Sequence, residues 1–123
     1  MITIYHNPRC SKSRETLERA QQFAAAHAIE LTVVDYQKTP LTLAQLAALH
    51  RTLQSEGKVA VRDMVRDGEE AFALLHLEHA DETALFDALA AHPILLQRPI
   101  VTFNARGIIA RPPQLADKVL IAP

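Results

Sequence analysis

The sequence contains a single cysteine among its 123 residues, and its charges nearly cancel at a net charge of −1. One cysteine excludes an internal disulfide and indicates a reducing compartment. A chain so close to neutral has no overall attraction to nucleic acid or to an anionic membrane surface. The first residues lack the basic and long apolar regions of a signal peptide, and no apolar run approaches the ~20 residues of a membrane span. We therefore expect a cytoplasmic protein whose partners include neither nucleic acid nor a membrane.

The remaining composition is typical of one globular domain, with 49% hydrophobic and 22% charged residues. Residues 2–5 are β-branched and aromatic, and they predict a strand closed by Asn7-Pro8. Residues 11–27 carry apolar side chains at helical spacing, and residues 31–36 predict a second strand. A helix between two strands forms a βαβ unit, so the strands should be parallel with a right-handed crossover.

The middle of the chain is predicted to be helical and to form an insertion, at about residues 42–91, within a single domain covering residues 1–123. Thr42 should begin the first of these helices, with Gln45 as its capping-box partner. Asp81 should cap the last one, which cannot pass His92-Pro93. The helices expected in this segment cover residues 42–57, 59–66, 69–77 and 81–91.

The last third returns to strands, at residues 100–103 and 108–110. The four residues between them, Asn104-Ala105-Arg106-Gly107, predict a hairpin turn because Asn and Gly favour turn conformations. Residues 114–121 can then form a closing helix. A βαβ unit followed by an antiparallel hairpin and a helix is the thioredoxin-like order. We therefore expect an α/β fold of that class, with its first βα turn at the ligand-binding edge of the sheet.

Cys10 lies in this first βα turn, at the predicted start of the helix. Amide N–H groups at a helix start carry partial positive charge and favour an anion there. The same field, together with Arg9, Lys12 and Arg14, favours thiolate and should lower the cysteine pKa below its free value of ~8.5. The alternative is an inert buried cysteine, which the charged and hydroxyl neighbours fit poorly. The pattern indicates a reactive thiol at a site that also attracts an anion.

Three segments carry a more specific signal: residues 5–14 (YHNPRCSKSR), residues 92–100 (HPILLQRPI) and residues 110–112 (ARP). Together, in this order and spacing, they resemble the glutaredoxin-coupled arsenate reductases, a thioredoxin-like family related to the Spx proteins. The resemblance implies reduction of arsenate to arsenite, with glutathione and glutaredoxin as partners. It also implies that Cys10 is catalytic and that three arginines bind the oxyanion. Those arginines are Arg66, Arg98 and Arg111. No bound cofactor is implied, since glutathione is a co-substrate.

Each of these arginines also has a simpler interpretation. Arg66 can be solvated, as most helix-surface charges are, or it can pair with a neighbouring carboxylate. The neighbouring carboxylates are Asp63, Asp67 and Glu69. Arg98 and Arg111 each precede a proline and can instead bind exposed backbone carbonyls. The resemblance implies a cis Arg98-Pro99 bond, which would bring the Arg98 loop beside the Cys10 turn.

The expected chemistry follows from these parts. Arginine forks and helix-start amides can hold a tetrahedral anion while the Cys10 thiolate attacks arsenic. His6 either supports the thiolate or passes a proton, or it is a strand-end histidine bonded to the backbone. Ser13 either hydrogen-bonds the thiolate or caps the helix. With no second cysteine in the chain, an external thiol must resolve the adduct.

Two other functions stay open. A glutathione-dependent thiol reductase with little arsenate activity would use the same scaffold, because fold and motif do not fix the substrate. A Spx-type redox regulator that binds RNA polymerase is the other, although Ser13 occupies the second position of its usual Cys-x-x-Cys switch. His76 and His79 are three residues apart without further ligands, so we expect no metal site. We expect a monomer.

Overall fold

Four strands form a single mixed sheet in the computed structural model, which describes residues 1–122. The strands are β1 (Ile2–His6), β2 (Leu31–Asp35), β3 (Ile100–Phe103) and β4 (Arg106–Ile109). Their order across the sheet is β2-β1-β3-β4. β1 and β2 are parallel, whereas β3 is antiparallel to both β1 and β4. The predicted βαβ unit and antiparallel hairpin are therefore confirmed.

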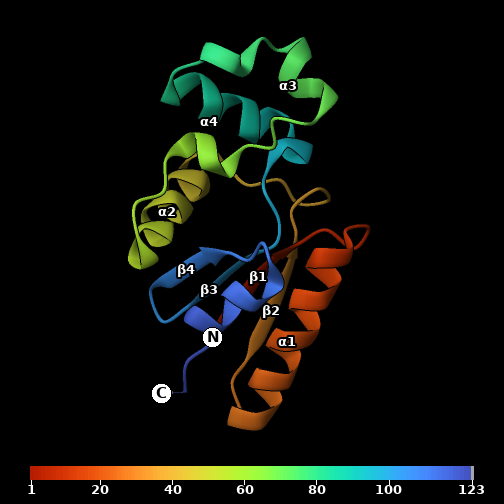
Figure 1. The fold of residues 1–123 in the computed structure, drawn as a ribbon, viewed down its shortest axis with the longest axis vertical. Helices are drawn as coiled ribbons and strands as arrows, with labels where there is room; N and C mark the ends of the chain where they lie inside the picture. Colours follow the sequence, from red (N-terminus) through yellow and green to blue (C-terminus); the bar gives the residue numbers. More distant parts are fainter. Residues whose placement is uncertain (123) are drawn as a thin grey trace.

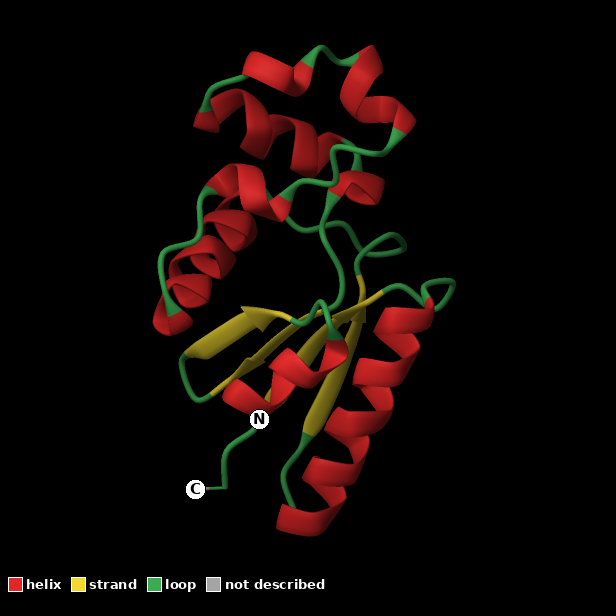
Figure 2. Cartoon of the chain, in the orientation of Figure 1, coloured by secondary structure: helices red, strands yellow, loops and turns green. Residues whose placement is uncertain are grey.

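One long helix accompanies the sheet, and a group of shorter helices lies between β2 and β3 in the chain. Figure 1 shows α1 alongside the strands, with α2, α3 and α4 stacked in the other half of the molecule. Figure 2 shows the same division between the yellow sheet and the red helices above it. The α-helices are α1 (Ser11–His27), α2 (Leu43–Leu53), α3 (Glu70–Leu74) and α4 (Glu82–Ala91). The 3-10 helices are η1 (Gln54–Glu56), η2 (Val61–Met64), η3 (Leu77–His79), η4 (Pro93–Leu95) and η5 (Pro113–Lys118).

The sheet separates two apolar clusters because successive side chains of a strand point to opposite faces. Ile2 and Ile4 of β1 are fully buried on the face covered by α1 and η5, where they join Ala20 and Ala116. The other cluster lies against α2 and α4 and includes Tyr36, Leu46, Leu49, Leu85, Leu95 and Ile100. The helices between β2 and β3 thus share one core with the far face of the sheet.

Two of the predicted helix starts have the expected caps. The Gln45 N–H donates to Thr42 Oγ1 at 3.1 Å, and the Thr42 N–H donates to Gln45 Oε1 at 2.9 Å. The Ala84 N–H donates to Asp81 Oδ1 at 2.8 Å. These side chains satisfy amide groups that have no partner inside the helix.

Three predicted helices are shorter or tighter than expected. The segment 59–66 contains only the 3-10 helix η2, because Val65 is extended and bridges to Leu96. The segment 69–77 ends as α3 at Leu74, since His76 adopts a left-handed conformation with φ of 55°. The segment 114–121 is the 3-10 helix η5, in which buried Pro113 and Ala116 are three residues apart. A spacing of three keeps them on one side of a 3-10 turn.

The hairpin turn is also tighter than the four residues predicted. Only Asn104 and Ala105 lie between β3 and β4, with φ of 51° and 63°. Two consecutive positive φ angles are typical of a type I′ turn, whose twist matches that of the flanking strands. Gly107 belongs to β4, where a Cβ atom would approach Thr52 Cγ2 to 3.0 Å. This glycine allows α2 to pack closely on the strand and plays no part in the turn.

The segment before β3 is tied to the segment after η2. The Arg66 N–H donates to the Leu95 carbonyl at 2.7 Å, and the Gln97 N–H donates to the Met64 carbonyl at 2.8 Å. The peptide bonds Arg98-Pro99 and Arg111-Pro112 are both cis. The first of these agrees with the expectation drawn from the resemblance. These connections bring Arg66 and Arg98 to the edge of the sheet where β1 ends.

Candidate active site

A tight turn after β1 fixes Cys10 as the N-cap of α1. The Cys10 N–H donates to the Asn7 carbonyl at 3.0 Å, and the Arg9 N–H donates to Asn7 Oδ1 at 3.0 Å. The Cys10 carbonyl accepts the first helical hydrogen bond, from Arg14, at 3.0 Å. The cysteine therefore has the helix-start position that the sequence predicted, and its side chain is partly exposed.

The pKa of the Cys10 thiol lies below its ordinary value of 9.0. Partial burial by itself raises this pKa, because it disfavours the charged thiolate. Hydrogen bonds from the Ser13 backbone, the Arg111 side chain and the Lys12 backbone outweigh that effect. The prediction of a lowered pKa is thus supported. The main causes are helix-start amides and a distant arginine, and the side-chain charges of the flanking residues are not among them.

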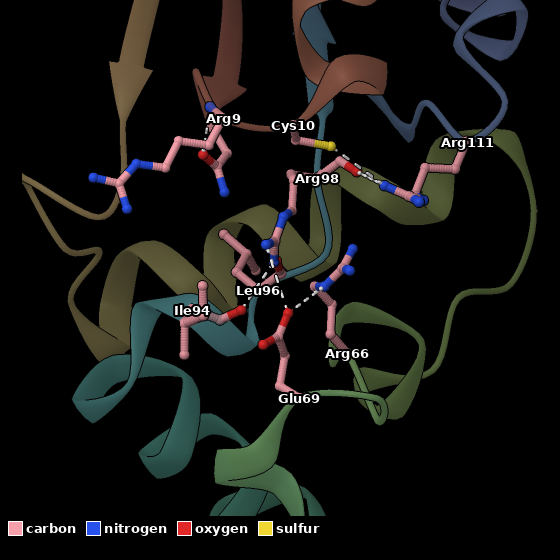
Figure 3. A network of polar contacts seen from close by, with 9 residues as sticks. Arg9, Cys10, Arg66, Glu69, Ile94, Leu96, Arg98 and Arg111 are labelled. Carbon is pink, nitrogen blue, oxygen red and sulfur yellow. Dashed lines mark hydrogen bonds and ion pairs between the residues drawn. The ribbon is translucent and has the colours of Figure 1, made fainter.

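Arg111 reaches Cys10 from the segment that follows β4, 101 residues along the chain. Its Nη1 lies 3.7 Å from Cys10 Sγ and also donates to the Arg98 carbonyl at 3.0 Å. Figure 3 shows the sulfur turned toward this guanidinium. The contact with the Arg98 carbonyl holds the guanidinium beside the thiol.

Arg98 is the most buried of the three arginines, with 6% of its surface exposed. Its Nη1 donates to the carbonyls of Ile94 and Leu96 at 2.9 and 3.2 Å. Its Nη2 lies 3.6 Å from Glu69 Oε1, and its buried Nε has no partner among the described residues. The sequence left Arg98 as either an oxyanion-binding residue or a partner of backbone carbonyls. The structure shows the carbonyl contacts, and Arg98 also lines a groove that contains Cys10.

Arg66 lies just beyond η2 and is partly buried. Its Nε donates to Glu69 Oε1 at 3.0 Å, so the alternative of a pairing with a neighbouring carboxylate is observed. Arg66 also borders the same groove as Cys10 and Arg98, so the ion pair does not remove it from the site.

The groove has a volume of about 480 Å³ and opens at the junction of the first βα turn and the helices between β2 and β3. Its lining residues are Asn7, Arg9, Cys10, Ser11, Gln37, Arg66, Glu69, Ile94 and Arg98. Three arginines and one carboxylate give this lining an excess of positive charge. A thiol of lowered pKa in a cationic groove suits attack on a small anion.

His6 and Ser13 are brought together, but away from the sulfur. His6 Nδ1 lies 2.7 Å from Ser13 Oγ, and the Asn7 N–H donates to the same oxygen at 3.0 Å. Within residues 1–122 no hydrogen bond joins either side chain to Cys10 Sγ. Burial lowers the pKa of His6 below 6.5, with the charge of Asp35 opposing the shift, so its surroundings favour the neutral imidazole. Both side chains thus brace the turn that presents the thiol.

Two side chains near the site were not among the predicted functional residues. Glu69 appeared only as one possible partner of Arg66, yet it contacts Arg98 as well. Tyr36 follows β2 and is 1% exposed. Burial raises the pKa of its phenol, and the charge of Arg98 opposes that shift. Since parallel strands end at one edge of a sheet, the position of Tyr36 directly after the second strand was a usable signal.

Across residues 1–122, no cluster of three or more His, Cys, Asp or Glu side chains is arranged to hold a metal ion. The helices of this same part of the chain include none that is long and apolar enough to cross a membrane.

Comparison with known proteins gives one consistent result. The model of the ArsC family matches residues 5–119. An arsenate reductase of Neisseria meningitidis serogroup B is 37% identical over 97% of this chain and 97% of its own length. The uncharacterized protein YfgD of Escherichia coli K12 is 39% identical over 92% and 91%. The solved structure of an arsenate reductase from Vibrio cholerae superposes with a TM-score of 0.83, at 38% identity over 96% of each chain. These similarities confirm the thioredoxin-like α/β fold.

Proposed function

The chain belongs to the ArsC family, and from this premise we propose that it is an arsenate reductase in which the Cys10 thiolate attacks arsenate bound in the groove. The strongest support for this proposal is the position of Cys10. The only thiol of the chain has a lowered pKa and opens into a groove that Arg66 and Arg98 also border. A neutral or acidic lining would hold an oxyanion poorly.

The reduction requires two electrons, and the chain supplies one thiol. The Cys10 sulfur forms a bond to arsenic while an arsenate oxygen leaves as water. A glutathione thiol then attacks the Cys10 sulfur, and the sulfur–arsenic bond breaks with its electron pair left on arsenic. The products are arsenite and a mixed disulfide between Cys10 and glutathione. Glutaredoxin reduces that disulfide and restores the thiol.

The three arginines have separable tasks in this scheme. Arg66 and Arg98 bind the oxygens of arsenate in the groove, where a planar fork can hold two oxygens at once. Arg111 stabilises the thiolate, which it approaches to 3.7 Å. We assign His6 and Ser13 a positioning role, because their mutual hydrogen bond braces the turn that carries Cys10.

The proposal also covers the setting of the reaction. The chain acts as a single domain in which residues 42–91 are an insertion that supplies Arg66 and Glu69 to the groove. One chain contains every proposed site residue, so a monomer suffices. Glutathione and a free thiol require a reducing compartment, and we propose the cytoplasm.

The test is an assay that couples disulfide reduction to NADPH, with glutathione, glutathione reductase and glutaredoxin present. We expect NADPH consumption that depends on arsenate and that stops when glutathione is left out. Cys10→Ser should abolish it without changing the thermal unfolding temperature. Turnover sustained by thioredoxin alone would contradict the proposed resolution step. Reduction of glutathione mixed disulfides without any arsenate-dependent rate would identify a general thiol reductase.

A further inference from the structure

The groove contains a carboxylate that the reaction as written does not use. Glu69 is the N-cap residue of α3, and its side chain is 25% exposed. Its Oε1 lies 3.0 Å from Arg66 Nε and 3.6 Å from Arg98 Nη2. Figure 3 shows this oxygen between the two guanidinium groups. Glu69 therefore already contacts both arginines that are proposed to bind the substrate.

This arrangement places a negative charge within reach of any bound oxyanion. Because the Glu69 carboxylate contacts both guanidinium groups, an anion that binds to Arg66 and Arg98 comes close to it. If that oxygen carries no proton, two negatively charged groups meet, which disfavours binding. If it carries a proton, the O–H donates a hydrogen bond to the carboxylate, and a charge-assisted bond of this kind is strong.

Tetrahedral oxyanions differ at neutral pH in whether one of their oxygens carries a proton. Arsenate and phosphate keep at least one proton, whereas sulfate keeps none. Sulfate otherwise matches arsenate in shape, and arginine forks alone bind both. A site built only from Arg66 and Arg98 would therefore discriminate poorly between arsenate and sulfate.

We propose that Glu69 is a specificity-determining residue, which accepts a hydrogen bond from a protonated oxyanion and rejects an unprotonated one. This inference rests on the proposed function, because it concerns the oxyanion held in the same groove. Glu69 is partly exposed and contacts two arginines. It can therefore give up its contact with one arginine and accept a hydrogen bond from a substrate hydroxyl while the other contact remains. A glutamine amide at this position would instead donate an N–H hydrogen bond to a sulfate oxygen.

The experiment measures how well phosphate and sulfate protect Cys10 from iodoacetamide, at neutral pH and constant ionic strength. In the unmodified protein we expect half-protection by sulfate to require at least a tenfold higher concentration than half-protection by phosphate. In Glu69→Gln the sulfate concentration that gives half-protection should fall at least tenfold, so that it approaches the phosphate concentration. Glu70→Gln is the matched control, because Glu70 is exposed and does not line the groove. Glu69→Ala also removes the charge and serves if the glutamine variant does not fold.

Several outcomes would overturn the inference. These are an unchanged ratio in the folded Glu69 variants, an equal change in Glu70→Gln, or no protection by either anion in any variant. The reductase proposal is tested separately by the NADPH assay. Protection with the expected ratio but no arsenate-dependent turnover would refute the reductase proposal and leave the role of Glu69 standing. If sulfate inhibits arsenate turnover equally in the unmodified protein and in Glu69→Gln, the role of Glu69 is refuted and the reductase proposal stands.

Discussion

Replacing Arg111 by alanine is expected to raise the pKa of the Cys10 thiol. Within residues 1–122 the Arg111 guanidinium is the one charged side chain that hydrogen-bonds the sulfur, at 3.7 Å, and its charge also lowers the thiol pKa. Alanine removes both the charge and the hydrogen bond. The backbone N–H groups of Lys12 and Ser13 remain, so part of the depression should persist.

The size of the change follows from the separation of the two charges. Two unit charges 3.7 Å apart attract each other by about 1 kcal/mol in a water-like dielectric. That dielectric applies because Arg111 is exposed. Losing an attraction of this size lowers the fraction of thiolate, well below the midpoint, by about sixfold. The lost hydrogen bond acts in the same direction, so we expect the pKa of the thiol to rise and the thiolate fraction to fall by about six- to tenfold.

The assay is the rate of iodoacetamide alkylation as a function of pH, because only the thiolate reacts. Well below the midpoint, a rise of this size should slow alkylation by about six- to tenfold. Arg111→Lys keeps the charge and should recover most of the shift. Arg106→Ala removes an exposed charge on β4 that does not contact the thiol, and it is the control. A midpoint unchanged by Arg111→Ala, or moved equally by Arg106→Ala, would refute the assignment of the low pKa to this contact.

Two further predictions concern residues beneath and beside the groove. Arg98→Lys should lower kcat/KM for arsenate by at least ~10-fold, or about 1.4 kcal/mol, because lysine cannot hold two oxygens in one plane. It should also lower the melting temperature, since Arg98 is buried and bonds two carbonyls. Arg106→Lys, at an exposed position outside the groove, should do neither. An Arg98→Lys protein with normal kinetics would exclude this side chain from substrate binding. Leu95→Ala should destabilise the fold by about 2–5 kcal/mol in urea unfolding, because Leu95 is fully buried; a loss below 1 kcal/mol would show that the core under the groove is loosely packed.

The sequence by itself determined those features that depend on neighbouring residues. β-Branched and aromatic residues predicted the strands, and hydroxyl or carboxylate caps at Thr42 and Asp81 predicted two helix starts. The position of Cys10 at the start of a helix, together with its cationic neighbours, predicted the direction of the thiol pKa shift; of these two causes the structure supports the helix-start amides. The absence of a second cysteine was sufficient to require an external thiol. The strands, the caps and the helix-start amides at Cys10 depend on contacts within a few residues along the chain, whereas the need for an external thiol follows from composition alone.

Tertiary structure decided what depends on distant contacts. The helix expected over 59–66 gave way to a bridge between Val65 and Leu96, since its backbone groups found partners outside the segment. The burial of Arg98 was not visible in the sequence, where it resembled a surface-facing charge before a proline.

Tertiary structure also decided which residues make up the site. Cys10 receives its charged hydrogen-bond partner from Arg111, 101 residues along the chain. Glu69 faces Arg98 only because the segment after η2 is hydrogen-bonded to the segment before β3. Charges act through space, so the electrostatics of this groove follow from how the chain packs and cannot be obtained from the order of its residues alone.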